Sequence, residues 1–184
     1  MQYRKMGKNG PSVSVLGFGC GAIGGLLTKG DPADQRRTVA RALEAGITYF
    51  DTAQAYGNGR SEETIGPLLR ELKADVVLGT KFRLDKEQIP NAAAVIRDCL
   101  EGSLKRLGQD SVDLFNLHNR IGFDVSGNQG ALSVEQMSFR RAGPAIRGRA
   151  RRANKSVGRN YRRIGRDDIA TTRLSLSNCT NAIA

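Results

Sequence analysis

The 184-residue sequence contains no tryptophan, one histidine and three cysteines. Without tryptophan, and with only 5% aromatic residues, the core is predicted to be aliphatic. Cys20, Cys99 and Cys179 lack the spacing of metal ligands, and three cysteines cannot all pair with one another. These features favour free thiols, no structural metal site and a reducing, cytoplasmic location.

Long apolar runs are also missing. No stretch approaches the ~18 apolar residues typical of a membrane span. The N-terminal sequence MQYRKMGKNG has no apolar segment of the kind found in signal peptides. We therefore expect no membrane partner. The length is sufficient for one ordinary domain.

Acidic residues are scarce in only one part of the chain. Residues 1–137 hold 17 Lys/Arg and 16 Asp/Glu, whereas residues 138–184 hold 12 and 2. The net charge of +11 therefore belongs almost wholly to the last segment. A charge of this size can indicate nucleic-acid binding, but here it marks a change of composition. We treat residues 1–136 and 137–184 as two regions, the second an irregular basic tail.

Strands and helices are predicted to alternate through the first region. A turn cluster between residues 3–5 and 13–15 predicts an N-terminal β-hairpin. Strands are expected at residues 15–19, 47–50, 75–79 and 112–117, and helices at 32–46, 61–72, 92–107 and from Ser133 onward. Such alternation suits right-handed βαβ units in an α/β fold. Two architectures are compatible with it, an open doubly wound sheet and a (β/α) barrel.

Local signals mark the ends and faces of the predicted helices. Asp31 is a plausible cap and Pro32 a plausible first residue of the first helix. In the second helix, Ser61 and Thr64 are possible caps. In the third helix, which Gly108 closes, one face carries the apolar residues Ala93, Ile96, Leu100, Leu104 and Leu107.

A glycine motif follows the first of these strands. Residues 19–24 match G-x-G-x-x-G, and Asp51 ends the next strand, which imitates a dinucleotide-binding fingerprint. In that fingerprint the helix begins inside the glycine run, so that its N-terminus faces the pyrophosphate. Here residues 28–32 separate the glycines from the helix. A close-packed turn at a strand end is the favoured interpretation.

Four polar residues lie at the carboxyl ends of predicted strands. Asp51 ends the second strand, and Tyr56 lies in the loop after it. Lys81 and His118 follow the third and fourth strands. Taken singly, they could be a turn cap, a half-buried ring, a solvated charge and a core histidine. Together they predict one catalytic rim, because a tyrosine becomes a useful acid when a nearby cation, itself held by a carboxylate, stabilises its phenolate.

The words LGFGCG, GITYFDTAQAYGNGRSEE, GTKF and VDLFNLHN resemble the aldo-keto reductases over residues 1 to about 136. The resemblance implies a (β/α)8 barrel that reduces small carbonyl substrates with NADPH and without a metal. By the same resemblance Tyr56 would protonate the carbonyl oxygen, and Lys81 would stabilise the Tyr56 phenolate. Asp51 would hold Lys81 as an ion pair, and His118 would orient the carbonyl.

The resemblance further implies that Gly21 and Asn119 contact the cofactor. A complete barrel of this kind needs about 250 residues, whereas this chain follows the family for only about four βα units after the hairpin. In the family most phosphate-binding and adenosine-binding groups come from later strands. We therefore expect a partial barrel and a truncated reductase, inactive in this form and without specific NADPH binding.

The basic tail departs from the family, and we attribute this to a reading-frame slip near residue 137. Codons for Arg, Gly, Ala and Pro are rich in G and C, so a slipped frame in a GC-rich gene over-produces these residues. A plus-one reading of residues 157–160 permits Leu-Gly-Val-Thr, which resembles the family's fifth strand. The coding DNA tests this hypothesis, because its plus-one frame must continue the barrel.

Two other roles are possible for this sequence. The tail is a candidate arm for nucleic acid or other polyanions, and we expect any such binding to be non-specific and dependent on salt. Only Phe139 and Tyr161 are available in it for base stacking. Alternatively, the unpaired edges of a half-barrel could drive self-association.

Overall fold

The structure is a computed structural model that describes residues 1–8, 10–21, 23–123, 130–133, 136 and 164–165. The helices are α1 (Leu26–Lys29), α2 (Pro32–Glu44), α3 (Arg60–Glu71) and α4 (Ala92–Leu107), with a 3-10 helix η1 (Lys86–Asn91). The strands are β1 (Tyr3–Lys5), β2 (Ser12–Ser14), β3 (Phe18–Gly19), β4 (Tyr49–Asp51), β5 (Val77–Phe82), β6 (Ser111–Val112), β7 (Leu114–Leu117), β8 (Ile121–Gly122), β9 (Leu132–Ser133) and β10 (Ile164–Gly165).

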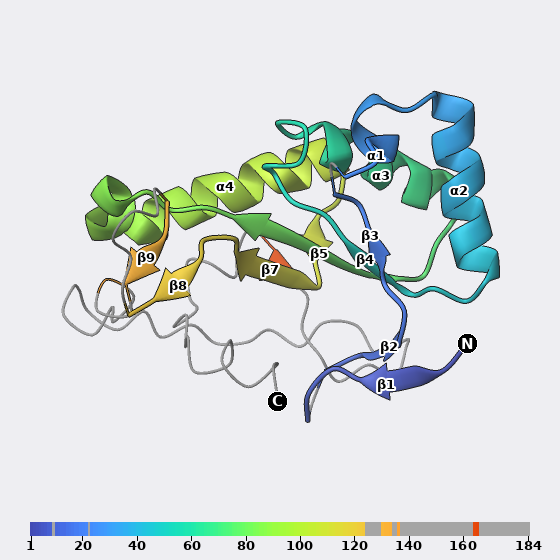
Figure 1. Cartoon of the computed structure of the whole chain (residues 1–184), viewed down its shortest axis with the longest axis horizontal. Coiled ribbons are helices and arrows are strands. Elements are labelled where there is room, and N and C mark those ends of the chain that lie inside the picture. Colours follow the sequence, from blue (N-terminus) through green and yellow to red (C-terminus); the bar gives the residue numbers. More distant parts are fainter. Residues whose placement is uncertain (9, 22, 124–129, 134–135, 137–163, 166–184) are drawn as a thin grey trace.

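The central sheet has four parallel strands in the order β3-β4-β5-β7. The order follows the sequence, with helices between successive strands (Figure 1). A doubly wound sheet reverses its strand order at a switch point, whereas a barrel adds each strand beside the last. The observed order is therefore that of a barrel.

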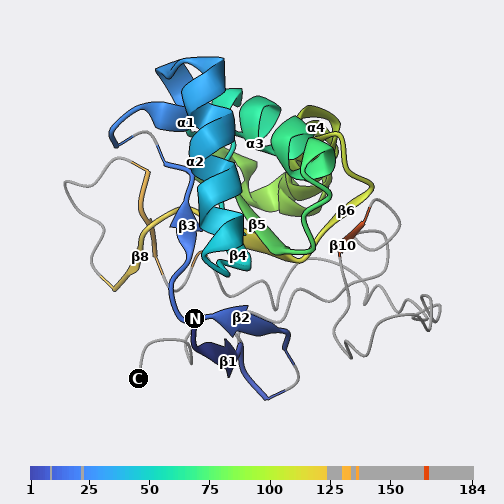
Figure 2. The ribbon, with the colours of Figure 1, turned by 90° about the vertical axis from the view of Figure 1, so that its right-hand side faces the viewer.

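The helices cover one face of this sheet. Figures 1 and 2, at right angles to each other, both place α2, α3 and α4 on the same side of the strands. The predicted hairpin forms from β1 and β2, which pair antiparallel, and lies at the other side of the sheet from the helices. One layer of helices outside one curved sheet is the arrangement of a barrel wall.

The local signals for α2 and α4 are confirmed. Asp31 caps α2 by accepting hydrogen bonds from two backbone N–H groups, and Pro32 occupies the first helical position. α4 spans the predicted residues and ends at Gly108, whose φ of 60° is left-handed. The buried face of α4 differs at one position, because Ala93 is exposed and Ala92 is buried.

The predicted capping of α3 is wrong. Ser61 and Thr64 were expected as possible caps, but the helix begins at Arg60 after Gly59, with no side-chain cap. Ser61 is fully buried and its Oγ donates to the carbonyl oxygen of Cys20 at 2.7 Å. The same hydroxyl lies 2.8 Å from Thr52 Oγ1. Ser61 therefore ties the start of α3 to the ends of β3 and β4.

All four predicted strands differ from the observed ones in their bounds, and β4 starts two residues and ends one residue later than predicted. The predicted strand at residues 15–19 contracts to β3, and Val15 and Leu16 are more than half exposed. β5 continues to Phe82, so Lys81 lies inside the strand rather than after it. The fourth strand divides at Asp113, because its carboxylate turns back to accept a hydrogen bond from the Leu78 N–H at 2.8 Å.

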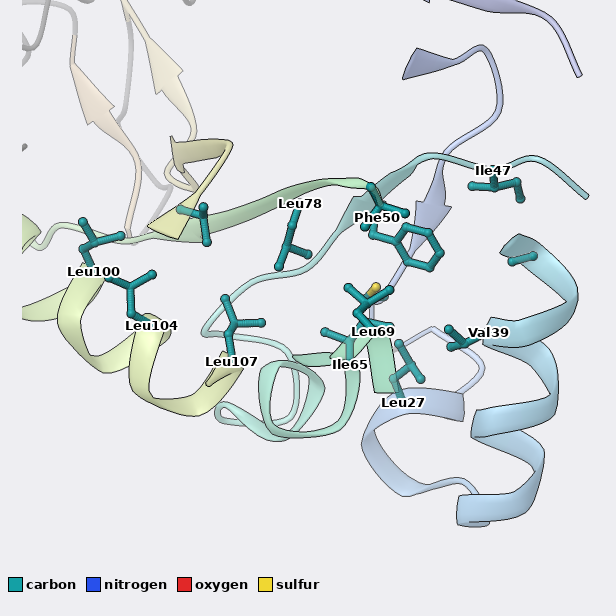
Figure 3. Close-up of a cluster of buried hydrophobic side chains, with 14 residues drawn as sticks. Leu27, Val39, Ile47, Phe50, Ile65, Leu69, Leu78, Leu100, Leu104 and Leu107 are labelled. Atoms are coloured by element: carbon teal, nitrogen blue, oxygen red, sulfur yellow. The ribbon is translucent and has the colours of Figure 1, made fainter. Parts of the chain in front are cut away.

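An aliphatic core fills the space between sheet and helices, as the absence of tryptophan predicts. Figure 3 shows leucines of α3 and α4 meeting Phe50 and Leu78 of the sheet, with Val39 of α2 beside them. Phe50 is fully buried, and its ring stacks on Phe18 at 5.1 Å between centroids. A second cluster joins Phe82 and Leu132 to the start of α4.

Of the predicted tail, residues 137–163 and 166–184 lie outside the described residues. β10 pairs antiparallel with β6. The helix predicted from Ser133 also falls mostly outside, although Ser133 and Gln136 exchange the two hydrogen bonds of a capping box. Within the described part of the chain, no helix has the length and apolar character needed to cross a bilayer.

Candidate active site

The inner face of β4 and β5 carries the predicted ion pair. Successive side chains of a strand point to opposite faces, and Phe50 faces the helices (Figure 3). Tyr49 and Asp51 therefore face away from the helices, toward the interior that a closed barrel would have. Asp51 lies opposite Gly79 of β5, and Lys81, two residues further on, shares that face.

The Lys81 ammonium has three hydrogen-bond acceptors. Its Nζ lies 2.6 Å from Asp51 Oδ2, 2.8 Å from the Thr52 carbonyl oxygen and 3.2 Å from the Tyr56 hydroxyl. An ammonium has three N–H donors, so this set matches its full capacity. The Lys81 side chain is 15% exposed and that of Asp51 is 30% exposed, which leaves the pair at the edge of solvent.

The Tyr56 ring is held between Lys81 and His118. The Lys81 ammonium lies 4.8 Å from the ring centroid, and the His118 ring meets the Tyr56 ring edge to face at 5.5 Å. The turn that carries Tyr56 continues through Gly57, Asn58 and Gly59, all with positive φ. This left-handed run lets the chain enter α3 directly after the tyrosine.

His118 directly follows β7, as predicted. Its backbone N–H donates to the Phe82 carbonyl oxygen at 2.7 Å. Burial lowers the pKa of His118, and the positive charges of Lys81 and Arg83 lower it further. The imidazole is therefore neutral at pH 7. Its Nδ1 is buried and has no hydrogen-bond partner among the described residues.

The structure brings Asp51, Tyr56, Lys81 and His118 together. That Gly21 and Asn119 contact a cofactor stays a prediction, and the two residues have different surroundings. A Cβ on Gly21 would lie 3.8 Å from the Tyr56 ring, so this glycine leaves space beside the phenol. Asn119 exchanges hydrogen bonds with the Leu84 backbone and donates to the Gly130 carbonyl, so both its amide hydrogens are used.

Two groups near the site were not predicted. The Tyr49 hydroxyl donates to Asp51 Oδ1 at 3.1 Å. Glu62, in the first turn of α3, is fully buried and joins Thr80 to Arg106. Tyr49 lies two residues before Asp51 on the same strand, and that spacing could have identified it. For Glu62 no comparable signal exists, because its partner Arg106 is 44 residues away.

The sequence profile of the Aldo/keto reductase family matches residues 15–137. The chain belongs to this family. Among its relatives, an aldo-keto reductase of Bacillus subtilis (YhdN) is 39% identical over 126 residues, covering 64% of this chain and 38% of the relative. The L-galactose dehydrogenase of Arabidopsis thaliana is 33% identical, covering 65% and 38%.

Solved structures of aldo-keto reductases have the same fold over the matched part. The holo form of AKR11C1 from Bacillus halodurans is 33% identical with a TM-score of 0.54, covering 66% of this chain and 41% of its own. The structure of PA4992 from Pseudomonas aeruginosa is also 33% identical, with a TM-score of 0.55 and coverages of 73% and 53%. The central parallel sheet and its helices are thus part of a (β/α)8 barrel. The chain spans less than two fifths of the length of these two curated relatives.

Proposed function

We propose that this site serves the reduction of a small carbonyl compound to an alcohol, with NADPH as the hydride donor. The observation that carries the proposal is the position of Lys81 Nζ, within hydrogen-bond distance of both Asp51 Oδ2 and the Tyr56 hydroxyl. In this arrangement Tyr56 donates the proton to the carbonyl oxygen, and Lys81 stabilises the phenolate that remains. Asp51 fixes the ammonium in place.

His118 is suited to orienting the carbonyl. A neutral imidazole carries one N–H, and the lowered pKa of His118 keeps this form at pH 7. Its ring lies against that of Tyr56. A carbonyl oxygen near the Tyr56 hydroxyl would then have a second hydrogen-bond donor, which favours one orientation of the substrate.

The reacting end of a nicotinamide cofactor would lie beside Tyr56. Gly21 has no side chain next to the phenol ring, and a flat ring needs such space. The cofactor, when bound, supplies the hydride. A relative from Schizosaccharomyces pombe, 30% identical over 127 residues, is named an aldo-keto reductase [NADP(+)]. Gly21 would border the nicotinamide. Asn119 Oδ1 accepts one hydrogen bond, from the Leu84 N–H, and its second lone pair would accept one from the cofactor.

The polypeptide of residues 1–184 is expected to show no turnover by itself. The family match ends at residue 137, and in the family most groups that hold the cofactor's phosphates lie in later strands. A titration of the polypeptide with NADPH, followed by cofactor fluorescence, should show no saturable binding. Saturable binding would contradict the predicted inactivity while leaving the proposed chemistry in place.

The proposed chemistry is tested in a completed barrel. Residues 1–137 can be joined to the part of the Bacillus subtilis relative that follows its matched segment, and NADPH oxidation measured with a panel of aldehydes and ketones. The fusion should turn over, and Tyr56→Phe in it should not. A folded fusion that binds NADPH but reduces no carbonyl, or one that Tyr56→Phe leaves active, would overturn the proposal.

A second candidate function, polyanion binding, is favoured by the charge of residues 138–184, which hold 12 cationic and 2 acidic residues. Binding of the full chain to a labelled DNA duplex should weaken steeply with salt, and an unrelated sequence should bind equally well. A chain ending at residue 137 is the control. Sequence preference or weak salt dependence would contradict non-specific binding.

A further inference from the structure

Tyr49, on the inner face of β4, lies beside the proposed catalytic groups. The Tyr49 hydroxyl donates to Asp51 Oδ1 at 3.1 Å, while the other oxygen of the same carboxylate accepts from Lys81 at 2.6 Å. The carboxylate is therefore held at both oxygens, once by a neutral donor and once by a cation. Rotation about its terminal bond would break both hydrogen bonds.

The space for the Tyr49 ring comes from glycines on both sides. A Cβ on Gly17, just before β3, would lie 2.9 Å from Tyr49 Cδ1, closer than side-chain carbons approach. A Cβ on Gly79 of β5 would lie 3.4 Å from the Tyr49 hydroxyl and 3.6 Å from Asp51 Oδ1. The ring thus lies where the two neighbouring strands have no side chains, with its hydroxyl directed along β4 toward Asp51.

The Tyr49 hydroxyl is a donor at all ordinary pH values. Burial raises its pKa well above the usual value, and the Asp51 carboxylate raises it further. A hydroxyl that stays protonated can keep donating its hydrogen bond to the Asp51 carboxylate over that pH range. Tyr49, Asp51, Lys81 and Tyr56 then form one hydrogen-bonded chain that ends at the proposed proton donor.

We propose that Tyr49 is a positioning residue, whose hydroxyl fixes the Asp51 carboxylate so that Asp51 Oδ2 holds Lys81 against Tyr56. The inference rests on the proposed function for its catalytic meaning, but the geometry it predicts is measurable in the full chain without turnover. A functional side chain is held in a productive geometry when hydrogen bonds from neighbouring groups lock its rotamer, and Tyr49 would do this for Asp51.

The test uses the full chain labelled with 13C at the tyrosine Cζ carbon, whose NMR shift reports the hydrogen bonding and charge of each hydroxyl. The sequence has four tyrosines, at positions 3, 49, 56 and 161, so four signals are expected and single Phe variants assign them. Tyr49→Phe keeps the ring and removes the hydroxyl. The Tyr56 signal should move by more than its linewidth.

Tyr3→Phe is a matched control, because the Tyr3 hydroxyl also donates one hydrogen bond of 3.1 Å, to the Gly46 carbonyl away from the site. It should leave the Tyr56 signal in place. Gly17→Ala keeps the Tyr49 hydroxyl but displaces the ring, so it should move the Tyr56 signal. In a Lys81→Met background, Tyr49→Phe should have no further effect on that signal, because the connection to Tyr56 runs through Lys81.

An unchanged Tyr56 signal in folded Tyr49→Phe would overturn the inference. So would a shift of equal size in the Lys81→Met background, since the effect would then bypass Lys81. Failure of the completed barrel to reduce carbonyls is a separate result, which removes the proposed function and leaves the positioning by Tyr49 to be decided by the NMR shifts.

Discussion

Two ion pairs of equal length lie on the two sides of β5 and differ in what surrounds them. Lys81 and Asp51 meet at 2.6 Å on the inner face, with side chains 15% and 30% exposed. Arg106 and Glu62 also meet at 2.6 Å, but in the helix layer, where Glu62 is fully buried and Arg106 is 24% exposed. Thr80, next to Lys81 in the chain, donates to Glu62 at 2.6 Å.

The comparison shows how one strand serves two purposes through the alternation of its side chains. On the helix side, Thr80, Glu62 and Arg106 satisfy one another, and the pair joins α3 to α4. On the inner side the Lys81 ammonium also contacts the hydroxyl of Tyr56, the proposed proton donor. Length alone does not distinguish the two pairs. The two pairs differ in burial and in the third group that each contacts, which is Tyr56 for Lys81 and Thr80 for Glu62.

The largest difference is expected in catalysis. Lys81→Met in the completed barrel should lower turnover by about 100-fold or more, because proton donation by a positioned side chain contributes about 10²- to 10⁴-fold. Its effect on stability should be only about 1 kcal/mol, since Asp51 is partly hydrated and keeps the Tyr49 hydrogen bond. Turnover with several carbonyls and urea unfolding measure the two effects. Equal turnover would contradict the role of Lys81.

Arg106→Met should instead have a large effect on stability. It leaves the buried Glu62 carboxylate without its cation, and breaking a buried pair in this way costs about 3 to 5 kcal/mol. Urea unfolding of the full chain, followed by circular dichroism, gives the loss. A loss below that of Lys81→Met would contradict burial as the source of the difference between the two pairs.

A smaller effect is expected in the pH dependence of stability, and it comes from the titration of His118. Its folded pKa is lowered, while the unfolded side chain titrates near 6.5. The unfolded chain therefore binds the proton first, so the contribution of His118 to stability is present above pH 6.5 and is lost as pH falls through the folded pKa. His118 is the only histidine. His118→Asn should reduce the fall in urea midpoint between pH 7.5 and pH 5.5, and an unchanged fall would assign it to other groups.

The smallest effect is expected at Arg36, which also meets its partner Glu71 at 2.6 Å, with side chains 55% and 53% exposed. An exposed pair contributes about 0 to 1 kcal/mol. Arg36→Met therefore serves as the control of equal length for Arg106→Met. Urea unfolding should give nearly the wild-type midpoint, and a loss similar to that of Arg106→Met would mean that length, not burial, sets the contribution.

Local signals predicted the elements best where cap and periodicity agreed. α4 has apolar residues at helical spacing and a glycine after its last residue, and its bounds are those predicted. The capping of α3 was wrong because Ser61 bonds to Cys20 and Thr52, which come from other strands. Asp113 divides the last strand for a similar reason, since its acceptor role toward Leu78 is a tertiary contact.

The sequence by itself determined which polar groups the candidate site holds and where they come in the order of elements. An acid, a phenol, an amine and an imidazole follow or end successive parallel strands, and carboxyl ends of parallel strands lie at one edge of a sheet. Strand spacing was compatible with both a barrel and a doubly wound sheet, and the resemblance implied the barrel. The tertiary structure decided between them, because pairing order depends on which strand edges meet. It also showed that Glu62 is joined to Thr80 and Arg106, partners 18 and 44 residues away that only folding brings within hydrogen-bond distance.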